Sequence, residues 1–300
     1  MTPSLRALLG GVIDYAGLFP PAAIEMAEAV QRFGAYRSGP HGWMLGRMIV
    51  PMALIDEFER ALADSAPEPG RPEPWPVSVV AAYPYDGSVA RIWDFNGRHG
   101  ACGDRVAIID SIEAKAETVS EVERLADAVP AGFDLFVEAP AMNAPPGLLE
   151  SIARSGGAAK LRTGGVLPEH VPPALGLATS VVACHRAGIS FKATAGLHHP
   201  IRADRPLTYD ARPPRAKLHG FLNLLVASAV VRAGWVDATG AAEVLAEESP
   251  DAFTFASDSL AWRGHQLTMG ELRASRRFLR SFGSCSFDEP VAGLETLALL

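Results

Sequence analysis

Short apolar runs rich in β-branched residues alternate with longer amphipathic stretches along most of the chain. The short runs suit the two-residue period of a strand, and the longer ones suit the 3.6-residue period of a helix. Strands that alternate with helices form parallel sheets, and eight such units close into a barrel. The predicted strands cover residues 11–15, 47–51, 77–82, 105–110, 134–138, 159–163, 189–194 and 252–257. The pattern therefore predicts an α/β fold of the (β/α)8 TIM-barrel type.

The alternation continues across the Pro-rich stretch 66–76, so we expect residues 1–300 to form a single barrel domain. Between the seventh and eighth predicted strands the chain is much longer than an ordinary crossover. Long loops in compact domains are often functional covers, so residues 197–251 are expected to include a lid over the site. Residues 281–300 lack a strong period and are predicted to be an irregular tail.

Composition and charge narrow the function classes. Hydrophobic residues make up 48% of the chain and charged residues 20%, which is typical of a globular core. The net charge of −7 argues against a nucleic-acid partner. The apolar stretch 221–231 is far shorter than the ~20 residues that cross a bilayer, which argues against a membrane protein. Three distant cysteines without CxxC spacing suit the cytoplasm. A small-molecule substrate is expected, and a homodimer is the commonest assembly.

Two lysines are candidates for catalysis because the chain has few of them. There are four lysines among 27 basic residues, and Lys160 and Lys192 lie within predicted strands, in AAKLRTGG and ISFKATAGLHHP. A buried amine can attack a carbonyl group, whereas a guanidinium cannot. Strand alternation places Lys160 with Arg162, and Lys192 with Thr194, so these groups converge if both faces point into the barrel. Alternatively, each lysine extends past its strand to solvent.

The turn RTGG after the sixth predicted strand is a candidate anion site. Backbone N–H groups of Thr163, Gly164 and Gly165, together with the Arg162 guanidinium, suit an anionic substrate group. A tight turn into the next helix explains the same glycines.

Adjacent histidines follow the second lysine strand in the loop before Pro200. His198 or His199 can act as an acid, a base or a metal ligand there. With Glu138 and Asp258 they would complete a divalent-metal site, although a metal-free polar role or a structural role is also open.

Further substrate-binding candidates lie at the ends of the first and eighth predicted strands. Asp14 and Tyr15 begin the loop DYAGLFPPA, which either lines a pocket or packs as a barrel connection. Ser257 and Asp258 follow the eighth predicted strand.

The two lysine segments resemble class I aldolases of the deoxyribose-phosphate aldolase type. The likeness is carried by KLRTG at 160–164 and FKATAGLH at 191–198 and covers the second half of the chain. Weaker likeness extends to VAIIDSIEAK at 106–115, LFVEAP at 135–140 and FTFASDSLA at 253–261. The resemblance implies that Lys160 forms a Schiff base and that Lys192 is its electrostatic partner.

The sequence departs from this family pattern at two positions. The proton-relay aspartate of the fourth strand would fall at Ala107, so that role is absent or shifted to Asp110. The expected proton carrier is His198 or Asp110. The phosphate-binding turn after the eighth strand would contain Asp258, whose charge favours a substrate without phosphate.

The leading hypothesis is a lyase or aldolase without a cofactor that acts on a small carbonyl compound. The alternatives are a metal-dependent hydrolase, lyase or isomerase, and a barrel that only binds a small anion.

Overall fold

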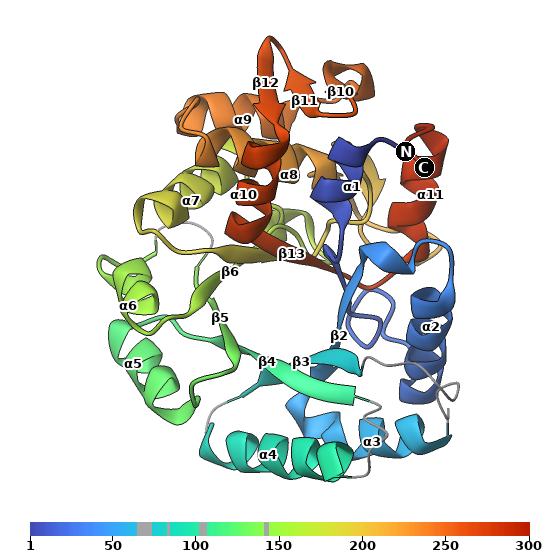
Figure 1. The fold of residues 1–300 in the computed structure, drawn as a ribbon, viewed down its shortest axis with the longest axis vertical. Helices are drawn as coiled ribbons and strands as arrows, with labels where there is room; N and C mark the ends of the chain where they lie inside the picture. The colour runs from blue at the N-terminus through green and yellow to red at the C-terminus, as the bar shows by residue number, and fades with distance from the viewer. Residues whose placement is uncertain (65–73, 83–84, 102–106, 141–143) are drawn as a thin grey trace.

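Eight parallel strands form a closed barrel in the computed structural model, which describes residues 1–64, 74–82, 85–101, 107–140 and 144–300. Their order is β1-β13-β7-β6-β5-β4-β3-β2, and β2 pairs with β1 to close the ring (Figure 1). The predicted α/β barrel is therefore confirmed. The barrel strands are β1 (Ile13–Tyr15), β2 (Leu45–Pro51), β3 (Trp75–Ala81), β4 (Ala107–Lys115), β5 (Asp134–Glu138), β6 (Ala158–Arg162), β7 (Phe191–Thr194) and β13 (Leu279–Ser284).

Helices surround the barrel, as Figure 1 shows. Two of them, α5 (Val119–Ala128) and α10 (Met269–Phe278), begin with capping boxes in which a threonine and a glutamate satisfy the free N–H groups of the first turn. The helices before the excursion are α1 (Pro3–Leu9), α2 (Met26–Ser38), α3 (Ile55–Asp64), α4 (Asp86–Ala101), α5 (Val119–Ala128), α6 (Leu148–Arg154) and α7 (Ala174–Arg186). Single 3-10 turns occur at Gly42–Met44, Met52–Leu54, Pro168–His170 and Pro250–Ala252.

A long excursion connects β7 to β13, as the sequence predicts. It begins with an antiparallel hairpin that lies at the carboxyl end of the barrel. A three-stranded antiparallel sheet follows two helices and lies outside the ring of barrel strands (Figure 1, orange). The elements are β8 (Ala203–Pro206), β9 (Arg215–Leu218), α8 (Phe221–Arg232), α9 (Ala238–Ala246), β10 (Phe253–Phe255), β11 (Ser259–Trp262), β12 (His265–Thr268) and α10 (Met269–Phe278).

The prediction of residues 252–257 as the eighth barrel strand is wrong. The strand there, β10, pairs with β11 in the small antiparallel sheet, and β13 is the eighth strand of the barrel. The alternating pattern AFTFAS is typical of a strand with one exposed face. In contrast, β13 is buried along nearly its whole length, with Arg280 the half-buried exception.

The prediction of an irregular tail at 281–300 is also wrong. Its first residues belong to β13, and α11 (Asp288–Thr296) follows. Asp288 and Glu289 lie in the first turn of α11, where negative charge is favourable to the helix dipole. The Tyr36 hydroxyl donates to Asp288 at 2.5 Å, which joins α11 to α2.

The most apolar segment of the chain is an interior helix. In α8 every residue from Phe221 to Val231 is buried, because α7, α9 and α10 pack around it. A helix that is hydrophobic on all sides suits such a position. None of the helices in the described part of the chain has the length and apolar character needed to span a bilayer.

Ion pairs close the amino end of the barrel. The Arg47 guanidinium contacts Asp110 and Asp134 at 2.7 Å each, and Arg280 also pairs with Asp134. These residues lie at or near the starts of β2, β4, β5 and β13. Two arginines and two aspartates therefore neutralise one another at this end.

Candidate active site

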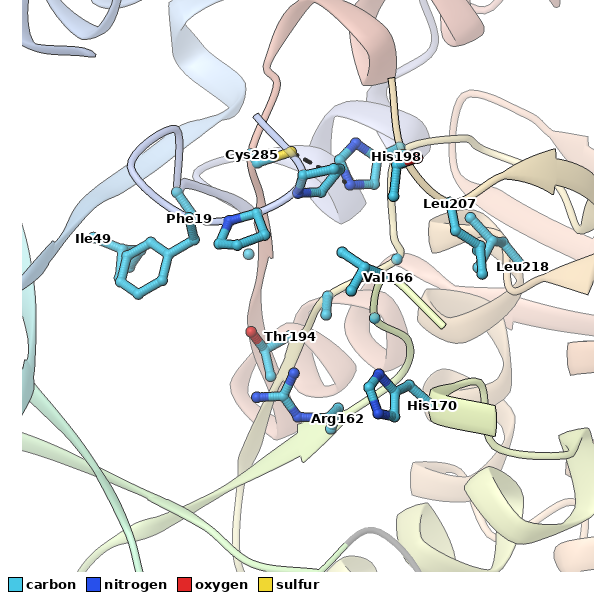
Figure 2. A pocket seen from close by; sticks show the side chains of 18 of the residues that line it. Phe19, Ile49, Arg162, Val166, His170, Thr194, His198, Leu207, Leu218 and Cys285 are labelled. Atoms are coloured by element: carbon cyan, nitrogen blue, oxygen red, sulfur yellow. Dashed lines mark hydrogen bonds between the residues drawn. The ribbon is translucent and has the colours of Figure 1, made fainter. Parts of the chain in front are cut away.

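A cavity of about 420 Å³ opens at the carboxyl end of the barrel. Its floor is polar, and its walls include Phe19, Val166 and Leu218 from three different loops or strands (Figure 2). The β8–β9 hairpin contributes Leu207 and Tyr209 to the lining. The volume suits a small organic ligand.

The two candidate lysines are neighbours across the β6–β7 pair. Lys160 lies directly opposite Lys192 in the strand register, and Glu138 on β5 lies opposite Lys160. Both lysines line the cavity together with Arg162 and Thr194. Lys160 is 7% exposed and Lys192 is 1% exposed. The expected convergence of two amines and a guanidinium is therefore present.

Carboxylates alternate with these cations from the barrel interior to the cavity. Lys192 Nζ donates at 2.6 Å to both Asp14 and Glu113. Lys160 Nζ lies 3.0 Å from the other Glu113 oxygen and 2.9 Å from Glu138.

Two more hydrogen bonds extend this network at its ends. Arg162 donates to Glu138 at 2.8 Å. At the interior end, Ser281 Oγ donates to Asp14 at 2.6 Å. A buried charge is tolerated only when it is paired and hydrogen-bonded, and each of these groups meets that condition.

Glu113 is the centre of the network because it bridges the two lysines. Burial alone would raise the pKa of this carboxyl group, but the ammonium groups of Lys192 and Lys160 outweigh burial and lower it to about 2. Burial alone would lower the pKa of Lys192, but Asp14 and Glu113 outweigh it and raise that pKa. Glu113 and Lys192 are therefore both charged at neutral pH.

Acid should destabilise the protein through Glu113. Its pKa is about 2 in the folded chain against an ordinary value of 4.5. Because the pKa is lower in the folded protein, the Glu113 carboxylate stabilises the fold fully when the pH is above its ordinary pKa. This stabilisation is lost as the pH falls through the pKa of the folded state. We expect the unfolding temperature to drop between pH 4.5 and 2, measured by circular dichroism. In Glu113→Gln the drop should be smaller, and an equal drop would contradict this assignment.

The RTGG turn is held against the turn that follows β7. Thr163 is buried, and its hydroxyl donates to the Ala195 carbonyl at 2.5 Å. A Cβ on Gly164 would lie 3.0 Å from the Gly196 Cα. Gly165 lines the cavity, whereas Thr163 and Gly164 do not appear in its lining. The close packing of the two turns therefore positions the ends of both lysine strands.

Gly196→Ala should destabilise the protein by about 1–3 kcal/mol, because Gly196 has φ +80° and an alanine there is strained. Gly97→Ala is the matched control. Gly97 lies in α4 with nothing within 4 Å of its added Cβ, so this change should be neutral or stabilising. Urea unfolding of both variants measures the difference. Equal stability of the two variants would contradict the role given to this turn.

The adjacent histidines lie on the cavity wall in opposite protonation states. Burial alone would lower the pKa of His198, but hydrogen bonds to Cys285 and Glu289 raise it to about 9. Burial and nearby Arg205 lower the pKa of His199 to about 4. His198 is therefore an imidazolium at neutral pH, and His199 is neutral.

Several predicted site residues do not line the cavity. Asp14 is buried beneath Lys192, and Tyr15 packs against Phe33 and Tyr36 in the core. Asp110 lies near the start of β4, because this strand runs on to Lys115 instead of ending at residue 110. The placement of Asp110 at the carboxyl end is thus corrected.

Ser257 and Asp258 are exposed in the turn between β10 and β11, so the metal-site hypothesis loses its fourth ligand. Within the described ranges, no three His, Cys, Asp or Glu side chains are arranged to hold a metal ion.

Three residues of the site were missed by the sequence reasoning. Glu113 fell outside the predicted fourth strand, although inward alternation along AIIDSIEAK would have shown it. Cys285 and Glu289 fell in the segment predicted to be irregular. The acidic pair before an apolar run at 288–294 was the available signal for a helix start.

The fold and the site together define a TIM-type barrel with a buried lysine pair beneath a small cavity. Comparisons with family models, curated proteins and solved structures gave no match to this chain.

Proposed function

We propose that the chain is a carbon–carbon lyase of the aldolase type that acts on a small carbonyl compound through a Schiff base on Lys160. The observation that carries this proposal is the pair of register-matched lysines, bridged by one carboxylate, on the wall of a cavity. Buried primary amines next to other charged groups are suited to carbonyl chemistry. The resemblance of KLRTG and FKATAGLH to aldolase segments supports the same reaction class.

Lys160 is the better nucleophile of the two lysines. Lys192 is more deeply buried, is held by two carboxylates at 2.6 Å and has its Nζ 5.1 Å from the centre of the Phe136 ring. Its raised pKa keeps it an ammonium ion, which adds to a carbonyl group only after losing a proton. Lys160 makes longer contacts and is more exposed. Lys192 then acts as a fixed positive charge next to the reacting amine.

In the proposed reaction Lys160 first gives up one proton, and its amine adds to the substrate carbonyl carbon. Water then leaves as the proton is returned, which gives an iminium ion. Cleavage of the adjacent carbon–carbon bond moves its electron pair towards the iminium nitrogen and gives an enamine. One proton leaves the hydroxyl group of the departing fragment, and one is added to the enamine carbon. Hydrolysis of the imine then frees the second product.

Two further residues have roles in this proposal. Arg162 lines the cavity and is half exposed, so its guanidinium can bind a carboxylate on the substrate while it remains bound to Glu138. His198 lies on another wall, next to Cys285 (Figure 2), and is the proposed proton carrier.

Borohydride trapping tests the proposed function. The protein is incubated with small aldehydes, ketones and 2-oxo acids, reduced, and analysed by peptide mapping. We expect a reduced adduct on Lys160 for one class of carbonyl compound. Reversible thermal stabilisation by the same compounds without an adduct on Lys160 or Lys192 would instead favour a binding protein.

A further inference from the structure

A second group of reactive side chains lies on the cavity wall, and the proposed lysine chemistry uses only one of its members. Cys285 follows the end of β13, His198 lies in the loop after β7, and Glu289 is in the first turn of α11. All three line the same cavity as Lys160. Figure 2 shows Cys285 and His198 facing each other, away from Arg162 and Thr194.

The three side chains are connected in the order carboxylate, imidazole, thiol. Glu289 Oε2 lies 2.6 Å from His198 Nδ1, and Cys285 Sγ lies 3.8 Å from His198 Nε2. A carboxylate at Nδ1 orients the ring and stabilises its charged form, which places the Nε2 proton next to Cys285 Sγ. The Tyr209 hydroxyl donates to the other Glu289 oxygen at 3.1 Å and so helps to orient this carboxylate. The arrangement is that of a base-activated nucleophile.

His198 and Glu289 are both charged next to Cys285. His198 carries a positive charge at neutral pH, and hydrogen bonds from His198 and Tyr209 outweigh burial and keep Glu289 ionised by lowering its pKa. An imidazolium ion beside a thiol stabilises the thiolate. The titratable groups that face this group from the surrounding elements are Tyr15 on β1, His198 and His199 after β7, Tyr209 between β8 and β9, and Glu289 on α11.

We propose that Cys285 is a second covalent centre of this cavity, a nucleophile activated by His198 and oriented through Glu289, which adds reversibly to a small aldehyde. A bond forms between Sγ and the carbonyl carbon, and the thiol proton replaces the proton that the His198 imidazolium gives up. The carbonyl π electrons move to oxygen, which takes the proton from His198 to give a thiohemiacetal. The step needs no further reagent and does not depend on a Schiff base at Lys160. Glu289 acts as a positioning residue.

Alkylation by iodoacetamide tests the activation of Cys285. Peptide mapping reports Cys285 and Cys184 separately in the same sample. Cys184 is the internal control, because it is fully buried in α7 and burial raises its pKa to about 12. We expect Cys285 to be alkylated at pH 7 at least about tenfold faster than Cys184.

Substitutions at His198, Glu289 and His199 separate the activation of Cys285 from its exposure. His198→Asn should slow the alkylation of Cys285 at pH 7 by about tenfold or more, and Glu289→Gln should slow it by less, an effect that Glu289→Asp should largely restore. His199→Asn is the matched control and should leave the rate unchanged. Alkylation of wild-type Cys285 no faster than that of Cys184 would overturn the proposal by itself, even if a variant failed to fold.

Aldehyde protection tests the carbonyl step separately from the lysine chemistry. Propanal should slow the alkylation of Cys285 but not of Cys184, and dilution should restore the rate. The same protection should persist in Lys160→Arg, which cannot form a Schiff base at position 160. Borohydride trapping of the wild type and of this variant reports the lysine chemistry independently. Loss of protection in that variant would show that the aldehyde was held by Lys160, and would refute covalent capture by Cys285.

Discussion

Lys160→Arg should abolish carbonyl turnover and borohydride trapping while the barrel remains folded. Arginine keeps a positive charge between Glu113 and Glu138, so the ion-pair network retains its charge balance. A guanidinium does not form the Schiff base, and loss of a catalytic nucleophile lowers kcat by about 10⁴-fold or more. The measurements are turnover of whichever carbonyl compound labels the wild type, the reduced adduct mass, and the circular dichroism spectrum.

Lys115→Arg is the matched control for this experiment. Lys115 is at the end of β4, its side chain is 69% exposed, and it pairs with Glu117 outside the cavity. Turnover and labelling should match those of the wild type. Full activity in a folded Lys160→Arg protein would reject the proposed mechanism, because no guanidinium can replace the amine in an imine.

Glu113→Gln should cause the largest loss of stability among single substitutions in the site. The change keeps the side-chain size but removes the negative charge that lies between the two lysines at 2.6 and 3.0 Å. Breaking a buried ion pair from one side costs about 3–5 kcal/mol, because it leaves an uncompensated buried charge. Urea unfolding followed by tryptophan fluorescence measures the apparent free energy of unfolding.

Glu117→Gln provides the same chemical change at an exposed position. Glu117 pairs with Lys115, and both side chains are more than half exposed. Exposed pairs contribute about 0–1 kcal/mol, so this variant should unfold close to the wild type. Similar stability of the two variants would mean that Glu113 does not bridge two charged lysines.

The β6 and β7 segments show how much of this site could be predicted from local pattern. Short apolar runs between amphipathic stretches indicated the barrel, and alternation placed Lys160 with Arg162 and Lys192 with Thr194. Those inferences depend only on the period of a strand, which is a local property. Since these two strands are neighbours in the barrel, all four of these side chains line one cavity.

The eighth strand shows where local pattern was insufficient. AFTFAS at 252–257 has the alternation of a strand, but it forms an antiparallel hairpin outside the barrel, and β13 takes the place next to β1. The choice between these segments depends on which one is covered on both faces, and distant helices provide that cover. Because β13 is the eighth barrel strand, the segment predicted to be an irregular tail contributes Cys285 and Glu289 to the cavity.

The sequence by itself determined the fold class and the two lysine strands, because hydrophobic period and residue type act over a few positions. Only the tertiary structure decided which charges meet. Glu113 reaches both lysines because β4 extends to Lys115, and Asp14 and Asp110 lie below the cavity because of the strand register. The pairing of His198 with Cys285 and Glu289 joins segments about ninety residues apart. Ion pairs and proton transfer need contact within a few ångströms, and the closure of the barrel fixes that contact.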